Sequence, residues 1–328
     1  MTQARNASES KSDRGSTSAS QPNPLFRVLS LDGGGAKGIY TLGVLKEVES
    51  LLHRPVCEGF DLIFGTSTGA IITALIALGR SVDQIRDLYR SRVVEVMAEF
   101  LPRAKSAALQ RLASDEFGDQ DFSAFKTNVG IVCTRWQFEQ PMIFKTNIGQ
   151  AHGRSASFVP GFGCKIKDVV EASCSAYPFF RKKTVKTSND EEIALVDGGF
   201  CANNPTLYAI ADATKALKIP PKRVRVVSVG VGEYPTPVYG VLDLMRLVGY
   251  VPGVPLLQKV LEINTQSMDQ LRTILFGDIA TVRISKKYTE PEMATDLFEH
   301  DAKKLDQLWQ RGRQSFAEFE AELRAFLL

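Results

Sequence analysis

Hydrophobic positions along the chain follow two alternating patterns, which predict strands interleaved with helices. Short unbroken apolar runs predict buried strands at 26–31, 61–64, 129–134, 142–145, 193–196, 223–231 and 281–284. Apolar residues at helical spacing predict helices at 38–52, 70–78, 82–97, 166–172 and 204–217, and from 301 to the C-terminus. Strands that alternate with helices are typical of the α/β fold class. We therefore expect three layers, with a central, mostly parallel sheet flanked by helices.

The first 24 residues differ from the rest of the chain. Ser, Asn, Gln, Thr and charged residues dominate this stretch. It cannot bury enough apolar surface to offset the entropy of ordering it, so we predict a disordered tail at 1–24. It also lacks the apolar segment of a signal peptide. Residues 25–328 are expected to form one domain, with a motif-bearing core at 26–232 and a helical or lid-like portion at 233–328.

Composition and charge exclude some classes of function. Forty basic against thirty-seven acidic residues give a net charge of +3, without the concentrated basic excess of a nucleic-acid binder. No run of about 20 apolar residues predicts a membrane-spanning helix. The five cysteines form no CxxC pair and are expected as reduced, buried thiols, which fits a cytoplasmic protein. No His or Cys spacing suggests a metal site.

A G-x-S-x-G motif, Gly65-Thr66-Ser67-Thr68-Gly69, lies between a predicted strand and an apolar helix. A sharp strand-to-helix turn pushes a serine side chain clear of the sheet, and small flanking residues let the backbone pass. The helix dipole then favours negative charge near Ser67. The motif predicts a nucleophilic serine; the alternative is a Gly-Ser loop without catalysis.

A second glycine cluster, from Asp32 to Gly38, follows the first predicted strand. The N–H groups of Gly33, Gly34 and Gly35 can stabilise an anion, which in an esterase is the tetrahedral oxyanion. A Rossmann fingerprint would need an acidic residue closing the next strand, and a P-loop would need Ser or Thr after its Gly-Lys. Gly33, Gly35 and Gly38 do match the glycine spacing of a Rossmann fingerprint, but neither of these further requirements is met. A non-hydrolytic module that holds nucleotide phosphates on this loop stays open as an alternative.

The nucleophile needs a base, and the sequence favours Asp197 over the histidines. His53, His152 and His300 lie in contexts that do not tie any of them to Ser67. A predicted strand instead delivers Asp197 into Gly198-Gly199, a tight turn that would hold a carboxylate at the sheet edge. The alternative is that Asp197 only caps this turn.

Together these motifs resemble the patatin-like phospholipase family. The resemblance rests on DGGGAKG at 32–38, GTSTG at 65–69 and DGG at 197–199, with SCSAYP at 173–178 before the aspartate. It implies the patatin-like form of the α/β fold, Ser67 as nucleophile, Asp197 as general base and an acyl-enzyme formed from a lipid ester. It implies no metal and no cofactor. A same-fold esterase acting on other esters remains possible.

The chain also looks similar to bacterial members of that family that are activated by cyclic nucleotides in anti-phage signalling and degrade membrane phospholipid. This implies a cyclic dinucleotide activator and peripheral action at the inner membrane surface. Residues 236–263 are rich in Leu, Val and Tyr and broken by Pro and Gly. They are interpreted as a lid, an acyl-channel wall or a bilayer contact, or as an ordinary core helix pair. The sequence predicts no oligomeric state.

Overall fold

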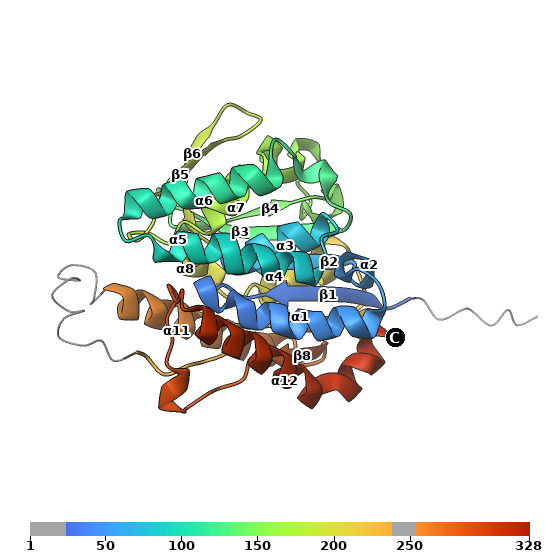
Figure 1. Cartoon of the computed structure of the whole chain (residues 1–328). Coiled ribbons are helices and arrows are strands. Elements are labelled where there is room, and N and C mark those ends of the chain that lie inside the picture. Colours follow the sequence, from blue (N-terminus) through green and yellow to red (C-terminus); the bar gives the residue numbers. More distant parts are fainter. Residues whose placement is uncertain (1–23, 238–252) are drawn as a thin grey trace, which may run out of the picture.

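Figure 1 shows the computed structural model, which describes residues 24–237 and 253–328. The described strands are β1 (Phe26–Leu31), β2 (Leu62–Thr66), β3 (Asn128–Arg135), β4 (Gln140–Lys145), β5 (Lys183–Lys186), β6 (Glu192–Asp197), β7 (Val224–Val229) and β8 (Ala280–Ile284). They form one sheet in the order β5-β6-β3-β2-β1-β7-β8, with β4 paired to β3. The five strands from β3 to β8 in this order run parallel, which confirms the predicted mostly parallel sheet.

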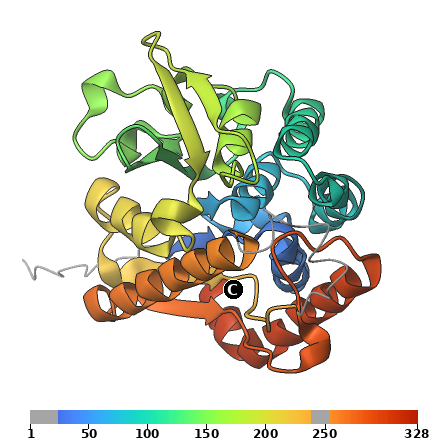
Figure 2. The ribbon, with the colours of Figure 1, turned by 90° about the vertical axis from the view of Figure 1, so that its left-hand side faces the viewer.

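The described helices cover both faces of the sheet. They are α1 (Gly38–Leu52), α2 (Val56–Gly59), α3 (Thr68–Ala77), α4 (Val82–Leu88), α5 (Val94–Ala98), α6 (Pro102–Phe117), α7 (Ile166–Ser173), α8 (Gly199–Ala202), α9 (Thr206–Ala211), α11 (Gly253–Leu275) and α12 (Ala302–Leu327). Successive strand residues point to opposite faces. Leu29 and Ile63 join the core formed with α1, α3 and α12, whereas Val28 and Leu62 join the core formed with α8 and α9. Three layers result, as Figure 2 shows.

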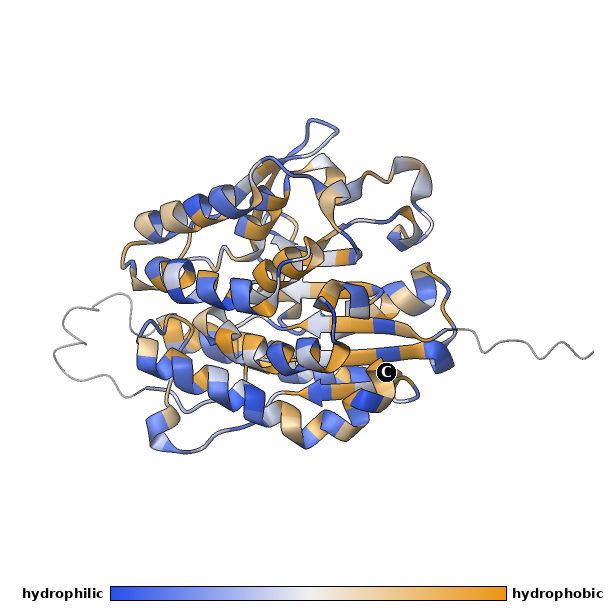
Figure 3. Ribbon diagram, turned by 45° about the vertical axis from the view of Figure 1, so that its right-hand side comes forward, coloured by the Kyte–Doolittle hydropathy of each residue, from blue (hydrophilic) through white to orange (hydrophobic). Residues whose placement is uncertain are grey.

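Figure 3 shows the expected distribution of hydropathy, with apolar strands inside and polar positions on the outward helix faces. Helices α1 and α12 pack closely against each other. A Cβ at Gly43 would lie 2.3 Å from Trp309 O, and one at Gly312 would lie 2.1 Å from Tyr40 O. The two glycines therefore let the backbones of these helices touch.

Several predictions are confirmed and others need correction. The helix predicted at 82–97 is one helical segment, but Tyr89–Val93 is a π-helical turn between α4 and α5. Helix α6 was not predicted, because its composition is largely polar and only part of one face is buried. The five cysteines are free and four are buried; Cys201 is partly exposed. Of the described helices, none has the length and apolar character needed to cross a bilayer.

Two predictions fall wholly or partly on residues that the structure does not describe. The predicted tail at 1–24 lies outside the described residues except for Pro24. Of the segment interpreted as a lid or helix pair at 236–263, residues 238–252 also lie outside them. The part from Gly253 onward is helical and continues as α11 to Leu275.

Candidate active site

The register of β3 with its neighbours brings Ser67 and Asp197 together. Strand β4 pairs with residues 130–135 along one edge of β3. Along the opposite edge, β2 pairs with residues 128–132 and β6 pairs with residues 133–135. Parallel β2 ends with Thr66 opposite Val132, and antiparallel β6 ends with Asp197 opposite Cys133. The residue after β2 therefore meets the last residue of β6. Ser67 Oγ lies 2.6 Å from Asp197 Oδ2, within hydrogen-bond distance.

Ser67 occupies a sharp turn between β2 and α3. Its backbone has φ 53° and ψ −122°, a conformation that costs a non-glycine residue about 1–3 kcal/mol. A Cβ at Gly65 would lie 2.3 Å from Gly69 O, and a Cβ at Gly69 would lie 2.3 Å from Leu31 O. Both glycines of G-x-S-x-G are thus required by backbone contact, as the motif predicts. The Ser67 N–H donates to Ser173 Oγ at 2.9 Å, which helps to hold the turn.

Asp197 is almost completely buried, with 2% of its surface exposed. Its Oδ1 accepts the Gly199 N–H at 2.7 Å, so both carboxylate oxygens are hydrogen-bonded. A Cβ at Gly198 would lie 2.1 Å from Val132 O, which explains the first glycine of the DGG motif. Loss of solvation on burial raises the pKa of Asp197 to about 7, although the Ser67 and Gly199 hydrogen bonds oppose this shift. A pKa near neutrality suits a general base.

We expect catalysis to depend on pH through this carboxyl group. Only the ionised form of Asp197 can accept the Ser67 proton, and its pKa is raised to about 7. The value of kcat/KM for a short soluble ester should rise about tenfold per pH unit below this pKa and level off above it. Initial rates across the pH range, with circular dichroism as a control for folding, measure this profile. A flat profile between about pH 5 and 8 would contradict a carboxylate base.

The glycine loop lies beside Ser67, but its three predicted donors are not equivalent. The Gly33 N–H donates to Asn203 O at 2.9 Å, so the prediction that Gly33 offers this group to an oxyanion is not supported by this geometry. Gly34 and Gly35 line the cavity together with Ser67. They are therefore the better candidates for oxyanion donors.

Asn203 is a site residue that sequence reasoning missed. Its Nδ2 donates to Gly33 O at 3.2 Å and to Thr265 Oγ1 at 2.7 Å, and its N–H donates to Asn264 Oδ1 at 2.8 Å. Asn203 thus connects the glycine loop to α11. No spacing in the sequence points to these contacts, because Asn203 lies 170 residues from Gly33 along the chain.

Replacement of Gly35 by alanine is expected to remove most activity. Gly35 has φ +59°, and a Cβ there would lie 2.2 Å from Leu297 O, so the loop must move. Gly118 is a matched control: its φ is +51° and nothing lies within 4 Å of the added Cβ. We expect ester hydrolysis to fall about a hundredfold for Gly35→Ala. Gly118→Ala should lose only about 1–3 kcal/mol of stability, the cost of a non-glycine residue in this conformation. Equal activities in the two variants would show that the loop's position is unimportant.

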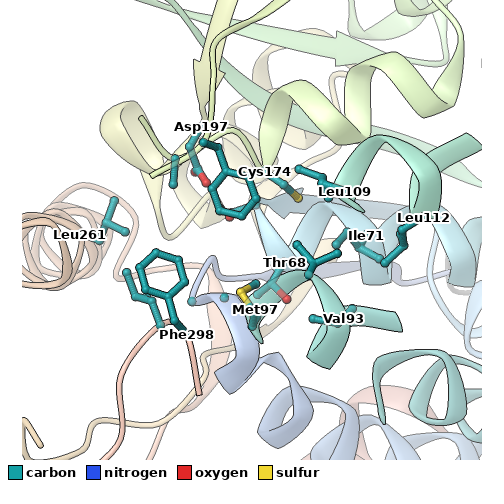
Figure 4. Close-up of a pocket in the computed structure, with 17 residues that line it drawn as sticks. Thr68, Ile71, Val93, Met97, Leu109, Leu112, Cys174, Asp197, Leu261 and Phe298 are labelled. Atoms are coloured by element: carbon teal, nitrogen blue, oxygen red, sulfur yellow. The ribbon is translucent and has the colours of Figure 1, made fainter. Parts of the chain in front are cut away.

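Ser67 and Asp197 face a largely apolar cavity (Figure 4). Its lining comes from α3, α5, α6, α11 and the adjoining loops and includes Ile71, Val93, Val96, Met97, Leu109, Leu112, Ala176, Phe180, Leu261, Leu297 and Phe298. Burial of an alkyl chain against such a lining is favourable by about 25 cal/mol per Å². The cavity therefore suits the acyl chain of an ester whose carbonyl lies at Ser67.

The histidines are placed elsewhere, as the sequence predicts. His53 follows the last residue of α1. His152 Nε2 lies 2.6 Å from Asp212 Oδ1, and His300 Nδ1 lies 3.0 Å from Phe298 O. None of them belongs to the cavity lining. Within the described ranges, no cluster of three or more His, Cys, Asp or Glu side chains could hold a metal ion.

Comparison with known proteins gives consistent matches. The family described as patatin-like phospholipase matches residues 29–210. The chain is 59% identical over 304 residues to a cUMP-AMP-activated phospholipase of Escherichia coli, covering 93% of this chain and 94% of that protein. It is 27% identical to a cGAMP-activated phospholipase of Pseudomonas aeruginosa, covering 78% and 77%. It is 29% identical to patatin-like protein 3 of Arabidopsis thaliana, covering 59% and 53%.

Proposed function

The chain belongs to the patatin-like phospholipase family and is a lipid acyl hydrolase, and we propose that Ser67 and Asp197 carry out its reaction on membrane phospholipid. The observation that carries this proposal is the 2.6 Å contact between Ser67 Oγ and Asp197 Oδ2 beside an apolar cavity. The alternative of a non-hydrolytic nucleotide module is not favoured, because the matching family and the Escherichia coli relative at 59% identity are both named as phospholipases.

The proposed reaction uses one base for two steps. Asp197 Oδ2 accepts the Ser67 proton while Ser67 Oγ attacks the ester carbonyl carbon. The tetrahedral intermediate collapses, the C–O bond to the lysolipid breaks, and the leaving oxygen takes the proton from Asp197. The acyl group then remains on Ser67. Asp197 next takes a proton from water, which attacks the acyl-enzyme and releases the fatty acid as Ser67 regains its proton.

The oxyanion formed in each step needs donors that are in place beforehand. We assign this role to the N–H groups of Gly34 and Gly35, because both residues line the cavity beside Ser67. Each donor in such a site contributes about 3 kcal/mol to stabilising the transition state. The N-terminus of α3 at Ser67 adds a favourable dipole.

A cyclic dinucleotide is the proposed activator. The relatives from Escherichia coli and Pseudomonas aeruginosa are named as activated by cUMP-AMP and by cGAMP. Because this chain is 59% identical to the Escherichia coli relative, we propose the same form of control for it. We also propose a role in anti-phage defence. The enzyme would act from the cytoplasm at the inner surface of the membrane.

The test is fatty-acid release from mixed phospholipid vesicles, with and without a panel of cyclic dinucleotides that includes cUMP-AMP and cGAMP. We expect release to increase sharply with one nucleotide and little with the others. Equal release with and without every nucleotide would remove the proposed control but leave the hydrolase in place. Substrate profiling with triacylglycerol and glycolipid would separate a phospholipase from a same-fold esterase of different specificity.

A further inference from the structure

Exposed apolar side chains gather close to the catalytic cavity on three separate elements. Leu101, which is 61% exposed, follows α5, whose Val96 and Met97 line the cavity. Tyr177, which is 39% exposed, follows the lining residue Ala176 directly. Large exposed apolar side chains are costly in water, and their grouping marks an interaction surface.

The third element is the outer face of α11. In the first half of this helix, the exposed apolar residues Leu256, Val260 and Ile263 recur at helical spacing and form one stripe. Leu257 and Leu261 lie on the opposite, buried face, and Leu261 lines the cavity. In Figure 2, α11 crosses the front of the molecule, on the side toward which the carboxyl ends of the parallel strands point. The stripe lies in the same half of α11 as the lining residue Leu261, and is therefore close to the cavity.

Basic and aromatic side chains accompany the apolar ones. Trp136 packs against Tyr177 at 5.2 Å between ring centroids, and Lys182 Nζ lies 3.9 Å from the Trp136 centroid. Arg103 at the start of α6 and Lys259 on α11 are also exposed. Aromatic rings with flanking cations are typical of side chains at a membrane interface, where anionic headgroups attract the basic groups.

We propose that the residues around Leu101, the Trp136–Tyr177 pair and the outer stripe of α11 form one membrane-docking surface that holds the cavity against an anionic bilayer. The inference rests on the proposed phospholipase function. A bilayer fits better than a second copy of the chain, because a protein seated beside the cavity would obstruct the lipid that must reach Ser67. Apolar side chains would enter the headgroup–acyl boundary while the basic groups contact phosphate.

The experiment measures vesicle binding of the full chain carrying Ser67→Ala, so that the lipid stays intact. The vesicles contain phosphatidylethanolamine and phosphatidylglycerol. Leu256→Asp with Ile263→Asp should weaken co-sedimentation at least about tenfold, because two apolar contacts are replaced by charges that anionic lipid repels. Leu101→Asp is a second variant that should fold, since Leu101 is the N-cap of α6, a position at which Asp is favoured.

Ile148→Asp is the matched control. Ile148 is 56% exposed and follows the last residue of β4. That strand ends opposite Gly130, near the amino end of β3, and Ser67 lies at the other end of the sheet. This variant should bind vesicles like the wild type. Binding by the α11 variant equal to that of this control would overturn the proposal. A change in molecular mass by light scattering, with binding retained, would instead identify a contact between copies and also overturn it.

Activity separates this proposal from the one on which it rests. For this measurement the α11 substitutions are made in a protein that keeps Ser67. The ratio of its activity on vesicle phospholipid to its activity on a short soluble ester should fall about tenfold relative to the wild type. Vesicle binding without hydrolysis of either substrate by the wild type, with every nucleotide tested, would defeat the proposed function and leave the docking surface intact. An unchanged ratio in both the α11 and Leu101 variants would defeat the docking surface alone.

Discussion

Replacement of Ser67 by alanine is expected to lower fatty-acid release by at least about 10⁴-fold. The hydroxyl is the group that attacks the ester, and its removal leaves only binding and the oxyanion donors. The protein should remain folded, because alanine removes one oxygen and the 2.6 Å contact to Asp197 without adding volume. Release from vesicles in the presence of the activating nucleotide measures the effect. Labelling with a fluorophosphonate, which reacts with activated serines, provides a second readout.

Ser175→Ala is a suitable control for the Ser67 variant. Ser175 is also buried near the site, but its hydroxyl donates to Glu171 O within the same chain segment. Loss of this bond should cost about 1 kcal/mol of stability and leave the nucleophile in place. Fluorophosphonate labelling should persist in this variant and disappear in Ser67→Ala. Labelling or fatty-acid release that survives in Ser67→Ala would assign the nucleophile elsewhere.

The local elements of the fold could be predicted from the sequence because they are encoded locally. Strand β1 and helix α1 match their predicted bounds, since an unbroken apolar run ends at a glycine cluster and a helical pattern then begins. The turn at Ser67 was predictable for the same reason. Its two glycines are the residues that the backbone contacts there demand.

Contacts between segments that are distant along the chain could not be predicted from the sequence. Strands β2 and β6 meet end to end along one edge of β3 because of their register with β3. No short sequence motif specifies that register. The engagement of the Gly33 N–H by Asn203 is likewise a contact across the chain, so the three glycines of the loop looked equivalent. Helix α11 was only partly anticipated, because exposed Leu and Ile residues obscure its amphipathic pattern.

Replacement of Asp197 by asparagine is expected to lower fatty-acid release by about 10³- to 10⁴-fold. Asparagine is nearly the same size; its carbonyl can accept the Gly199 N–H, and its amide can donate to Ser67 Oγ. It cannot take the serine proton, so the variant tests the base without disturbing the turn. Release from vesicles with the activating nucleotide measures the loss. A variant with near wild-type release would show that another group removes the proton.

The same substitution should stabilise the protein at high pH. Burial raises the pKa of Asp197 from 3.8 to about 7, so the fold favours the protonated carboxyl. As pH rises through this range, ionisation of the buried group costs the wild type on the order of 4 kcal/mol, a loss that the neutral amide avoids. The Tm of Asp197→Asn should therefore exceed that of the wild type near pH 8 and approach it near pH 5. A difference in Tm that does not change with pH would mean that Asp197 is ionised throughout, and that burial does not tune this base.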